Sequence, residues 1–273
     1  NINRKIIRYP KGKNMIKNNR TTDFTEIDDY EVNTKSSVLS HILRFLVTGV
    51  IIIVFLTITL TSAPKNQDLS SIRDDRTILG NKTAKNHYVM VTDVMCPYCT
   101  VFSRLTLENQ EKFEKYLKDH DIVFELRVTD FLYENNMDKY GFSRMSAEAV
   151  ACATEQNKFW DYYHQVIRRL WKDYQSKGIG SSKNAPAIKD LTVKYWQNIA
   201  KEVNLDDSFS TCLSEHKMLG KVKQNTAEAT TFMRRYNLNG MPSFKFGSFA
   251  TSGFDTSWDY SYVERFLEAG LKK

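Results

Sequence analysis

The feature that most constrains this chain is the tetrapeptide Cys-Pro-Tyr-Cys at positions 96–99. Residues 88–91 (YVMV) precede it as an apolar run that predicts a strand, and a stretch with helical periodicity follows it. Two cysteines on the first turn of a helix suit thiol–disulfide exchange, because the unpaired N–H groups and partial positive charge there favour a thiolate. Proline suits the first helical position. We therefore expect Cys96 to cap the helix, exposed and ready to ionise, and Cys99 to lie partly covered as the resolving thiol.

A Cys-x-x-Cys pair can also be half of a zinc site, but a structural zinc site needs four ligands. The sequence has no second Cys-x-x-Cys, and the remaining cysteines, Cys152 and Cys212, lie far apart. The proline between the first two cysteines, and the strand before them, favour redox chemistry over metal binding. We expect neither a metal nor a cofactor at Cys96 and Cys99.

The composition permits one sizeable domain with an appendage. The chain has 273 residues, of which 41% are apolar, so a substantial core can form. The formal net charge is +7, but the lysines and arginines are interspersed with acidic residues. Such mixing is typical of a solvated surface, and we predict no nucleic-acid partner.

An uncharged run of 19 residues, 45–63 (FLVTGVIIIVFLTITLTSA), is about long enough to span a bilayer. It predicts one N-terminal transmembrane helix that acts as a signal anchor. A buried core helix is the alternative, but the run is apolar on every face and leads into Pro64 and a polar stretch. Residues 61–63 resemble a cleavage site, so removal of the anchor after Ala63 stays open.

The predicted organisation places a disordered tail at 1–44, the anchor at 45–63, a polar linker at 64–85 and a folded domain at 86–273. Met15 could be the initiator. Near the span, two basic residues precede it and four follow it, so flanking charges do not favour an external domain. The cysteine chemistry does favour one, because disulfides persist in oxidising compartments. We therefore predict a single-pass protein of the cell membrane with its folded domain extracytoplasmic.

Within the folded domain, apolar periodicity predicts an ordered series of elements. In chain order these are a strand at 87–94, a helix at 100–120, a strand at 122–128, helices at 142–156, 159–174, 187–203, 207–215 and 219–236, strands at 242–246 and 248–254, and a helix at 257–269. A β-α-β unit separated from a β-β-α unit by a helical block predicts an α/β thioredoxin fold with a large helical insertion at about 140–237.

Four segments resemble the DsbA-like branch of the thioredoxin superfamily: residues 93–99 (DVMCPYC), 149–160 (AVACATEQNKFW), 209–213 (FSTCL) and 238–244 (LNGMPSF). They occur in the family's order, and the resemblance covers about 86–272.

The resemblance implies a membrane-tethered oxidase that introduces disulfides into unfolded exported proteins with free cysteines. Cys96 would be the nucleophile and Cys99 the resolving thiol, with Pro97 and Tyr98 completing the active-site loop. Met241 and a cis Pro242 would offer backbone hydrogen bonds to an extended substrate. A quinone-linked membrane partner would reoxidise the thiols.

Two features need separate comment. Many relatives carry an acidic residue six positions before the first cysteine, where this chain has Met90. We expect Asp93, the nearest acid, to be a turn or cap residue, and the Cys99 proton to leave through water. Cys152 and Cys212 are either two small buried residues or a structural disulfide, and we favour the disulfide.

Other functions stay open. A disulfide isomerase or reductase of the same fold can also carry Cys-Pro-Tyr-Cys, although residues 64–85 are too short and polar for the dimerisation module that isomerases usually need. A cytosolic glutaredoxin is disfavoured by the apolar span and the insertion. An envelope chaperone that binds substrates and has an incidental redox pair is the alternative from another class.

Overall fold

In the computed structural model, the described residues are 41–50 and 69–272. They belong to two compact units, Asn1–Ser62 and Ala63–Lys273, which we describe separately. In the first unit, residues 41–50 are helical, including the last four residues of the predicted tail. No helix in the described part of the chain is long and apolar enough to cross a membrane. Most of the predicted anchor, together with residues 1–40, lies outside the described residues.

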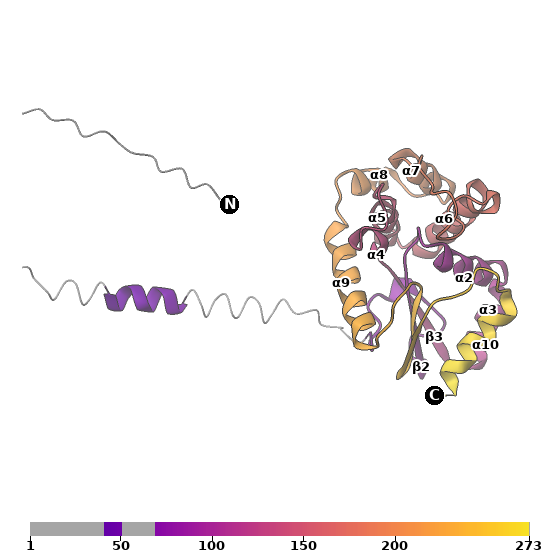
Figure 1. The fold of residues 1–273 in the computed structure, drawn as a ribbon, viewed down its shortest axis with the longest axis horizontal. Coiled ribbons are helices and arrows are strands. Elements are labelled where there is room, and N and C mark those ends of the chain that lie inside the picture. Colours follow the sequence, from indigo (N-terminus) through magenta and orange to yellow (C-terminus); the bar gives the residue numbers. More distant parts are fainter. Residues whose placement is uncertain (1–40, 51–68, 273) are drawn as a thin grey trace, which may run out of the picture. The chain divides into compact units, whose positions relative to one another are not determined.

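The second unit is built on a five-stranded sheet with the strand order β1-β3-β2-β4-β5 (Figure 1). The central strand β2 pairs in parallel with β3, and β4 pairs antiparallel with both β2 and β5. Gly247 has a positive φ of 56° in the tight turn between β4 and β5, a conformation that favours glycine. The strands are β1 (Ile78–Leu79), β2 (Asn86–Thr92), β3 (Ile122–Val128), β4 (Ser243–Phe246) and β5 (Phe249–Ser252).

Helices cover the sheet and extend beyond one end of it. Figure 1 shows α9 on one side of the sheet and α3 and α10 on the other, while α5 to α8 gather near α2. The helices are α2 (Pro97–Glu108), α3 (Gln110–Asp119), α4 (Phe131–Glu134), α5 (Phe142–Glu155), α6 (Phe159–Asp173), α7 (Val193–Glu202), α8 (Asp207–Ser214), α9 (Leu219–Arg235) and α10 (Tyr260–Leu271). The predicted thioredoxin fold with a helical insertion is confirmed.

Two predicted helices differ in extent. The helix predicted at 100–120 breaks at Asn109, whose side-chain amide donates to the Leu105 carbonyl at 3.0 Å and so competes with the helical backbone. The helix predicted from 187 begins only at Val193. The residues before it form a loop that buries Ile188 and Leu191 instead of continuing the helix.

Strand β3 is buried on both faces, although two of its residues are charged. All seven of its residues are buried, including Glu125 and Arg127. The Arg127 Nε donates to Glu125 Oε1 at 2.8 Å, and His87 Nε2 lies 2.8 Å from Glu125 Oε2. Charged residues can be buried here because each has partners of opposite charge.

The same polar cluster shows that the folded domain begins earlier in the sequence than predicted. Arg73 donates its backbone N–H to Glu125 Oε1 at 3.1 Å and forms an ion pair with Glu228 of α9. Shortly after it, β1 pairs with β3. Residues 73–79, which were predicted to belong to the linker at 64–85, therefore contribute structure to the domain, which begins before residue 86.

Candidate active site

The end of β2 and the start of α2 position the first cysteine pair. After Thr92 the chain turns, and the Cys96 N–H donates to the Asp93 carbonyl at 3.0 Å. Cys96 is the N-cap of α2, Pro97 is in its first turn, and the Thr100 N–H donates to the Cys96 carbonyl at 3.0 Å. The structure thus places Cys96 at the positive end of the helix, where a thiolate is favoured.

Both thiols are free, and both are more enclosed than the sequence suggested. Cys96 is 4% exposed and Cys99 is fully buried, so the prediction of an exposed Cys96 is wrong. The reason is a loop that approaches from a distant part of the chain. The Met241–Pro242 peptide bond is cis, and the Met241 carbonyl lies 3.8 Å from the Cys96 Sγ as its hydrogen-bond acceptor.

The environment of Cys99 differs from that of Cys96. Burial raises the pKa of the Cys99 thiol well above its ordinary value, and the neighbouring Cys96 acts in the same direction. The Thr92 hydroxyl and the Asp93 backbone lower it only in part. Burial therefore favours the protonated form of Cys99 in the dithiol.

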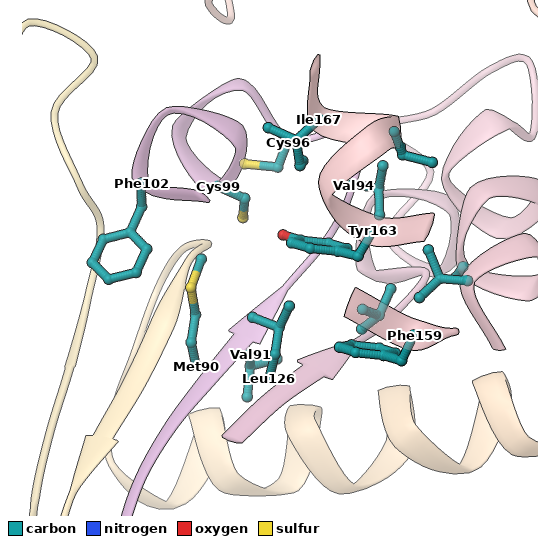
Figure 2. Close-up of a cluster of buried hydrophobic side chains, with 14 of the residues drawn as sticks. Met90, Val91, Val94, Cys96, Cys99, Phe102, Leu126, Phe159, Tyr163 and Ile167 are labelled. Carbon is teal, nitrogen blue, oxygen red and sulfur yellow. The ribbon is translucent and has the colours of Figure 1, made fainter. Parts of the chain in front are cut away.

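A tyrosine from the insertion lies beneath the pair. Figure 2 shows the Tyr163 ring of α6 with its hydroxyl directed toward Cys99. The hydroxyl lies 2.7 Å from Ser103 Oγ, and Ser103 Oγ donates to the Cys99 carbonyl at 3.1 Å. Burial raises the pKa of Tyr163, so the hydroxyl stays neutral. From the sequence, Tyr163 is only one residue of the helix predicted at 159–174, and its polar hydroxyl among apolar neighbours was the available signal.

Asp93 is a turn residue as predicted, but it is also fully buried. Its Oδ1 accepts from the Met95 N–H at 2.9 Å, and its Oδ2 accepts from the Leu132 N–H at 2.8 Å and the Ser143 hydroxyl at 2.6 Å. Burial raises the pKa of Asp93 to about 6 although these donors act in the opposite direction. A buried carboxylate is therefore present near the cysteines, but in the turn rather than at Met90, whose side chain is part of the core.

The other two cysteines form a disulfide between α5 and α8. The Cα atoms of Cys152 and Cys212 are 5.9 Å apart, and 60 positions separate them in sequence. The bond closes the helical insertion and lies outside the Cys96 site.

A nucleophilic thiol at a helix N-terminus, a buried second thiol three positions on and a cis-proline loop across from them define a thiol–disulfide oxidoreductase. The family model described as thioredoxin matches residues 73–268, and the chain belongs to this family. Among curated proteins, no sequence matches the chain.

Solved structures support the same fold. The oxidised form of BdbD from Bacillus subtilis is similar with a TM-score of 0.51 and 18% identity, covering 72% of this chain and 93% of that one. The thiol-disulfide exchange protein alpha-DsbA2 from Wolbachia pipientis has a TM-score of 0.51 and 14% identity, covering 76% and 92%. MdbA, a thiol-disulfide oxidoreductase from Corynebacterium diphtheriae, has a TM-score of 0.51 and 14% identity, covering 76% and 100%. The resemblance to DsbA-like proteins is thus confirmed in the fold.

Proposed function

We propose that this protein is an oxidase that donates the Cys96–Cys99 disulfide to exported proteins. The observation that carries the proposal is the position of Cys96 at the N-cap of α2, within reach of the Met241 carbonyl. A helix N-terminus stabilises a thiolate in general, and only the reduced protein has a thiol at this position that can ionise. Stabilising the reduced form makes the disulfide form a stronger oxidant.

The reaction begins with the disulfide form. A substrate thiolate attacks the Cys96 Sγ, the Cys96–Cys99 bond breaks, and Cys99 leaves with the electron pair and takes up a proton. A second substrate thiolate then attacks the substrate sulfur of this mixed disulfide, and Cys96 leaves as a thiolate. The substrate loses two electrons and gains a disulfide, and the protein becomes the dithiol.

The Met241 carbonyl supplies a backbone acceptor beside the reacting sulfur. An extended substrate can donate an N–H to such an acceptor whatever its side chains are, which suits an enzyme with many unfolded substrates. The catalytic pair needs no cofactor for this exchange.

The location and partners are also proposals. The uncharged run at 45–63 would tether the protein to the cell membrane by a single helix, with residues 69–272 outside the cytoplasm. The substrates would be unfolded exported proteins with free cysteines. A quinone-linked membrane protein would reoxidise the dithiol, since each turnover leaves two electrons on Cys96 and Cys99.

The deciding experiment is the redox equilibrium of the full chain with glutathione. Aliquots equilibrated at defined glutathione ratios are trapped by alkylation, and a Cys96→Ser/Cys99→Ser variant corrects for the second cysteine pair. A potential more oxidising than that of glutathione supports the oxidase. A potential well below it would make the protein a reductase or isomerase, the main alternative within the same class.

A further inference from the structure

A groove with a volume of about 360 Å³ opens directly beside the nucleophile. Met95 and Pro97, the two residues that flank Cys96, form one end of it. Its two walls come from the helical insertion: residues 137–142 between α4 and α5, and residues 180–188 before α7. Neither Met241 nor Pro242 lines it, so it is separate from the cis-proline loop.

Both walls are tied to the active-site turn. The Asp93 carboxylate holds the first wall, because it accepts from Met95 beside Cys96 and from Leu132 and Ser143 at the base of that wall. Gln175 holds the second wall: its amide donates to the Thr100 hydroxyl of α2 at 2.9 Å and to the Gly180 carbonyl at 3.5 Å. The groove is thus built onto the same turn that presents the nucleophile.

The surface of the groove combines apolar side chains with positive charge. Met137 is 58% exposed and Tyr140 is 48% exposed, although both are large and apolar. Lys139 and Lys183 also line the groove. Exposed apolar surface beside a reactive group is typical of a binding site.

The charges around the groove are unequal. The one acidic residue of the lining, Asp138, uses both oxygens internally, since it accepts from the Tyr140 N–H at 3.0 Å and the Ser143 N–H at 2.6 Å. The nearby ion pairs of the described residues join Arg144 to Asp130 and Glu134 and leave both groove lysines outside them. The two lysines therefore take part in no ion pair of the described residues, and with Asp138 counted the lining keeps one net positive charge.

We propose that this groove binds the segment of a substrate polypeptide next to its reacting cysteine, and that it prefers a segment with an apolar and an acidic side chain. The apolar side chain would pack on Met137 and Tyr140, and the acidic one would pair with Lys139 or Lys183. Because the two chain neighbours of Cys96 line the groove, a bound segment would bring its cysteine close to the reacting sulfur. The inference rests on the proposed function and adds a substrate preference to it.

The test uses the oxidised full chain and eight-residue peptides with a single cysteine beside a leucine. The peptides differ only in two flanking residues, which are glutamate, glutamine or lysine. Excess peptide reduces the Cys96–Cys99 disulfide, and two peptide thiols become one peptide disulfide. Each rate is divided by the same peptide's rate with bis(2-hydroxyethyl) disulfide, a neutral compound, which removes the effect of flanking charge on the thiol itself.

We expect the glutamate peptide to react about fivefold faster than the lysine peptide, with glutamine between them, since two exposed ion pairs contribute modestly. Salt at about 0.5 M should reduce the ratio through screening. Equal rates for the three peptides, or a faster lysine peptide, would overturn the inference. If the disulfide reacts neither with the peptides nor with dithiothreitol, the proposed function itself fails.

Variants of the two groove lysines test whether these residues cause the preference for acidic peptides. Lys139→Glu/Lys183→Glu should reverse the ratio, and Lys139→Gln/Lys183→Gln should bring it close to one. Lys172→Glu/Lys201→Glu is the matched control, because it makes the same change in net charge on exposed lysines of the insertion outside the groove; it should keep the ratio of the natural protein. A groove variant that folds, as judged by circular dichroism, and keeps the original ratio would contradict the assignment to this groove.

Discussion

The two cysteine pairs of this protein lie at opposite ends of helices. Cys96 caps the N-terminus of α2, whereas Cys152 and Cys212 lie in the last turns of α5 and α8. A helix dipole stabilises a thiolate at its N-terminus and destabilises one at its C-terminus. The helix end therefore favours the reduced form at the first pair, whereas the helix ends at the second pair, where Cys152 and Cys212 form a disulfide, give a thiolate no such stabilisation.

Chain connectivity acts in the same direction. Only Pro97 and Tyr98 separate the first two cysteines, so their disulfide would restrict the unfolded chain very little. The second disulfide closes a loop between positions 60 apart, which removes much more conformational freedom from the unfolded chain. Both disulfides are the same type of bond. Helix polarity and loop length together favour thiol exchange at the first pair and stabilisation of the fold at the second.

The largest expected effect is the loss of exchange when Cys96 is replaced by serine. A hydroxyl at this position cannot form the mixed disulfide, so the reduction of substrate disulfides and the oxidation of substrate thiols should both fall to the uncatalysed rate. The rate is measured with a peptide containing two cysteines, with the Cys152→Ala/Cys212→Ala variant as the control that keeps its activity. Substantial turnover by Cys96→Ser would break the comparison and favour a chaperone-like role in which the redox pair is incidental.

The second prediction concerns stability at the other pair. Cys152→Ala/Cys212→Ala should lower the free energy of unfolding by about 4 kcal/mol, an upper figure from loop entropy. Urea unfolding of the oxidised natural protein and the variant measures the difference, and thiol exchange by Cys96 should persist under native conditions. A difference near zero would mean that the unfolded chain is already restricted in this region.

Local patterns were enough to predict much of the fold and part of the site. The strand before Cys96, proline at the start of α2, and the helices of the insertion follow from residues close in sequence. The break at Asn109 was missed because a single asparagine decides it. The burial of Glu125 could not be predicted for another reason: besides Arg127, its partners His87 and Arg73 lie 38 and 52 positions away.

The parts of the site that were not predicted from the sequence also depend on contacts between residues far apart in the chain. Tyr163 reaches Cys99 only because the insertion packs on α2, and its partner Ser103 lies 60 positions away. The enclosure of Cys96 depends on Met241, 145 positions along the chain. Periodicity shows which face of a helix is buried, but not which of its polar atoms meets a distant thiol.

A third prediction extends the comparison to the turn beneath the first pair. The pKa of Asp93 is about 6 in the fold, against 3.8 for an ordinary aspartate, so the folded protein holds this proton more tightly than the unfolded chain. The resulting stability is fully present below about pH 4 and is lost as the pH rises through 6. The loss amounts to about 3 kcal/mol by pH 7.

Asp93→Asn does not titrate and serves as the reference. Unfolding of both proteins is measured at pH 4 and pH 7, and the stability of the natural protein relative to the variant should fall as the pH rises. A constant difference would show that burial does not perturb this carboxylate. The rate of exchange with dithiothreitol, which does not need the groove, should be unchanged, because the Asp93 oxygens bond to Met95, Leu132 and Ser143 rather than to Cys99. A large loss would instead assign Asp93 to the path of the Cys99 proton.

The smallest expected effect tests whether Tyr163 of α6 acts on the reactive pair through its hydroxyl or only through packing. When a thiol attacks the Cys96–Cys99 disulfide, negative charge develops on a Cys99 sulfur that is fully buried. The neutral Tyr163 hydroxyl is directed toward Cys99 (Figure 2) and bonds to Ser103, which donates to the Cys99 carbonyl. Because this hydroxyl can turn from Ser103 to donate to the developing charge, Tyr163→Phe should slow the attack by dithiothreitol about fivefold, the equivalent of one hydrogen bond of about 1 kcal/mol. It should also raise the pH at which Cys99 is alkylated in the dithiol form.

Tyr162→Phe is the matched control, since it removes a hydroxyl that is equally buried on the same helix but donates to the Trp196 carbonyl at 3.1 Å, away from the cysteines. Both variants lose one buried hydrogen bond and should be destabilised to a similar degree, but only Tyr163→Phe should change the rate and its pH profile. Equal changes in both variants would mean that α6 acts on the active site only through packing, and that the reactivity of the first pair depends on the end of α2 alone.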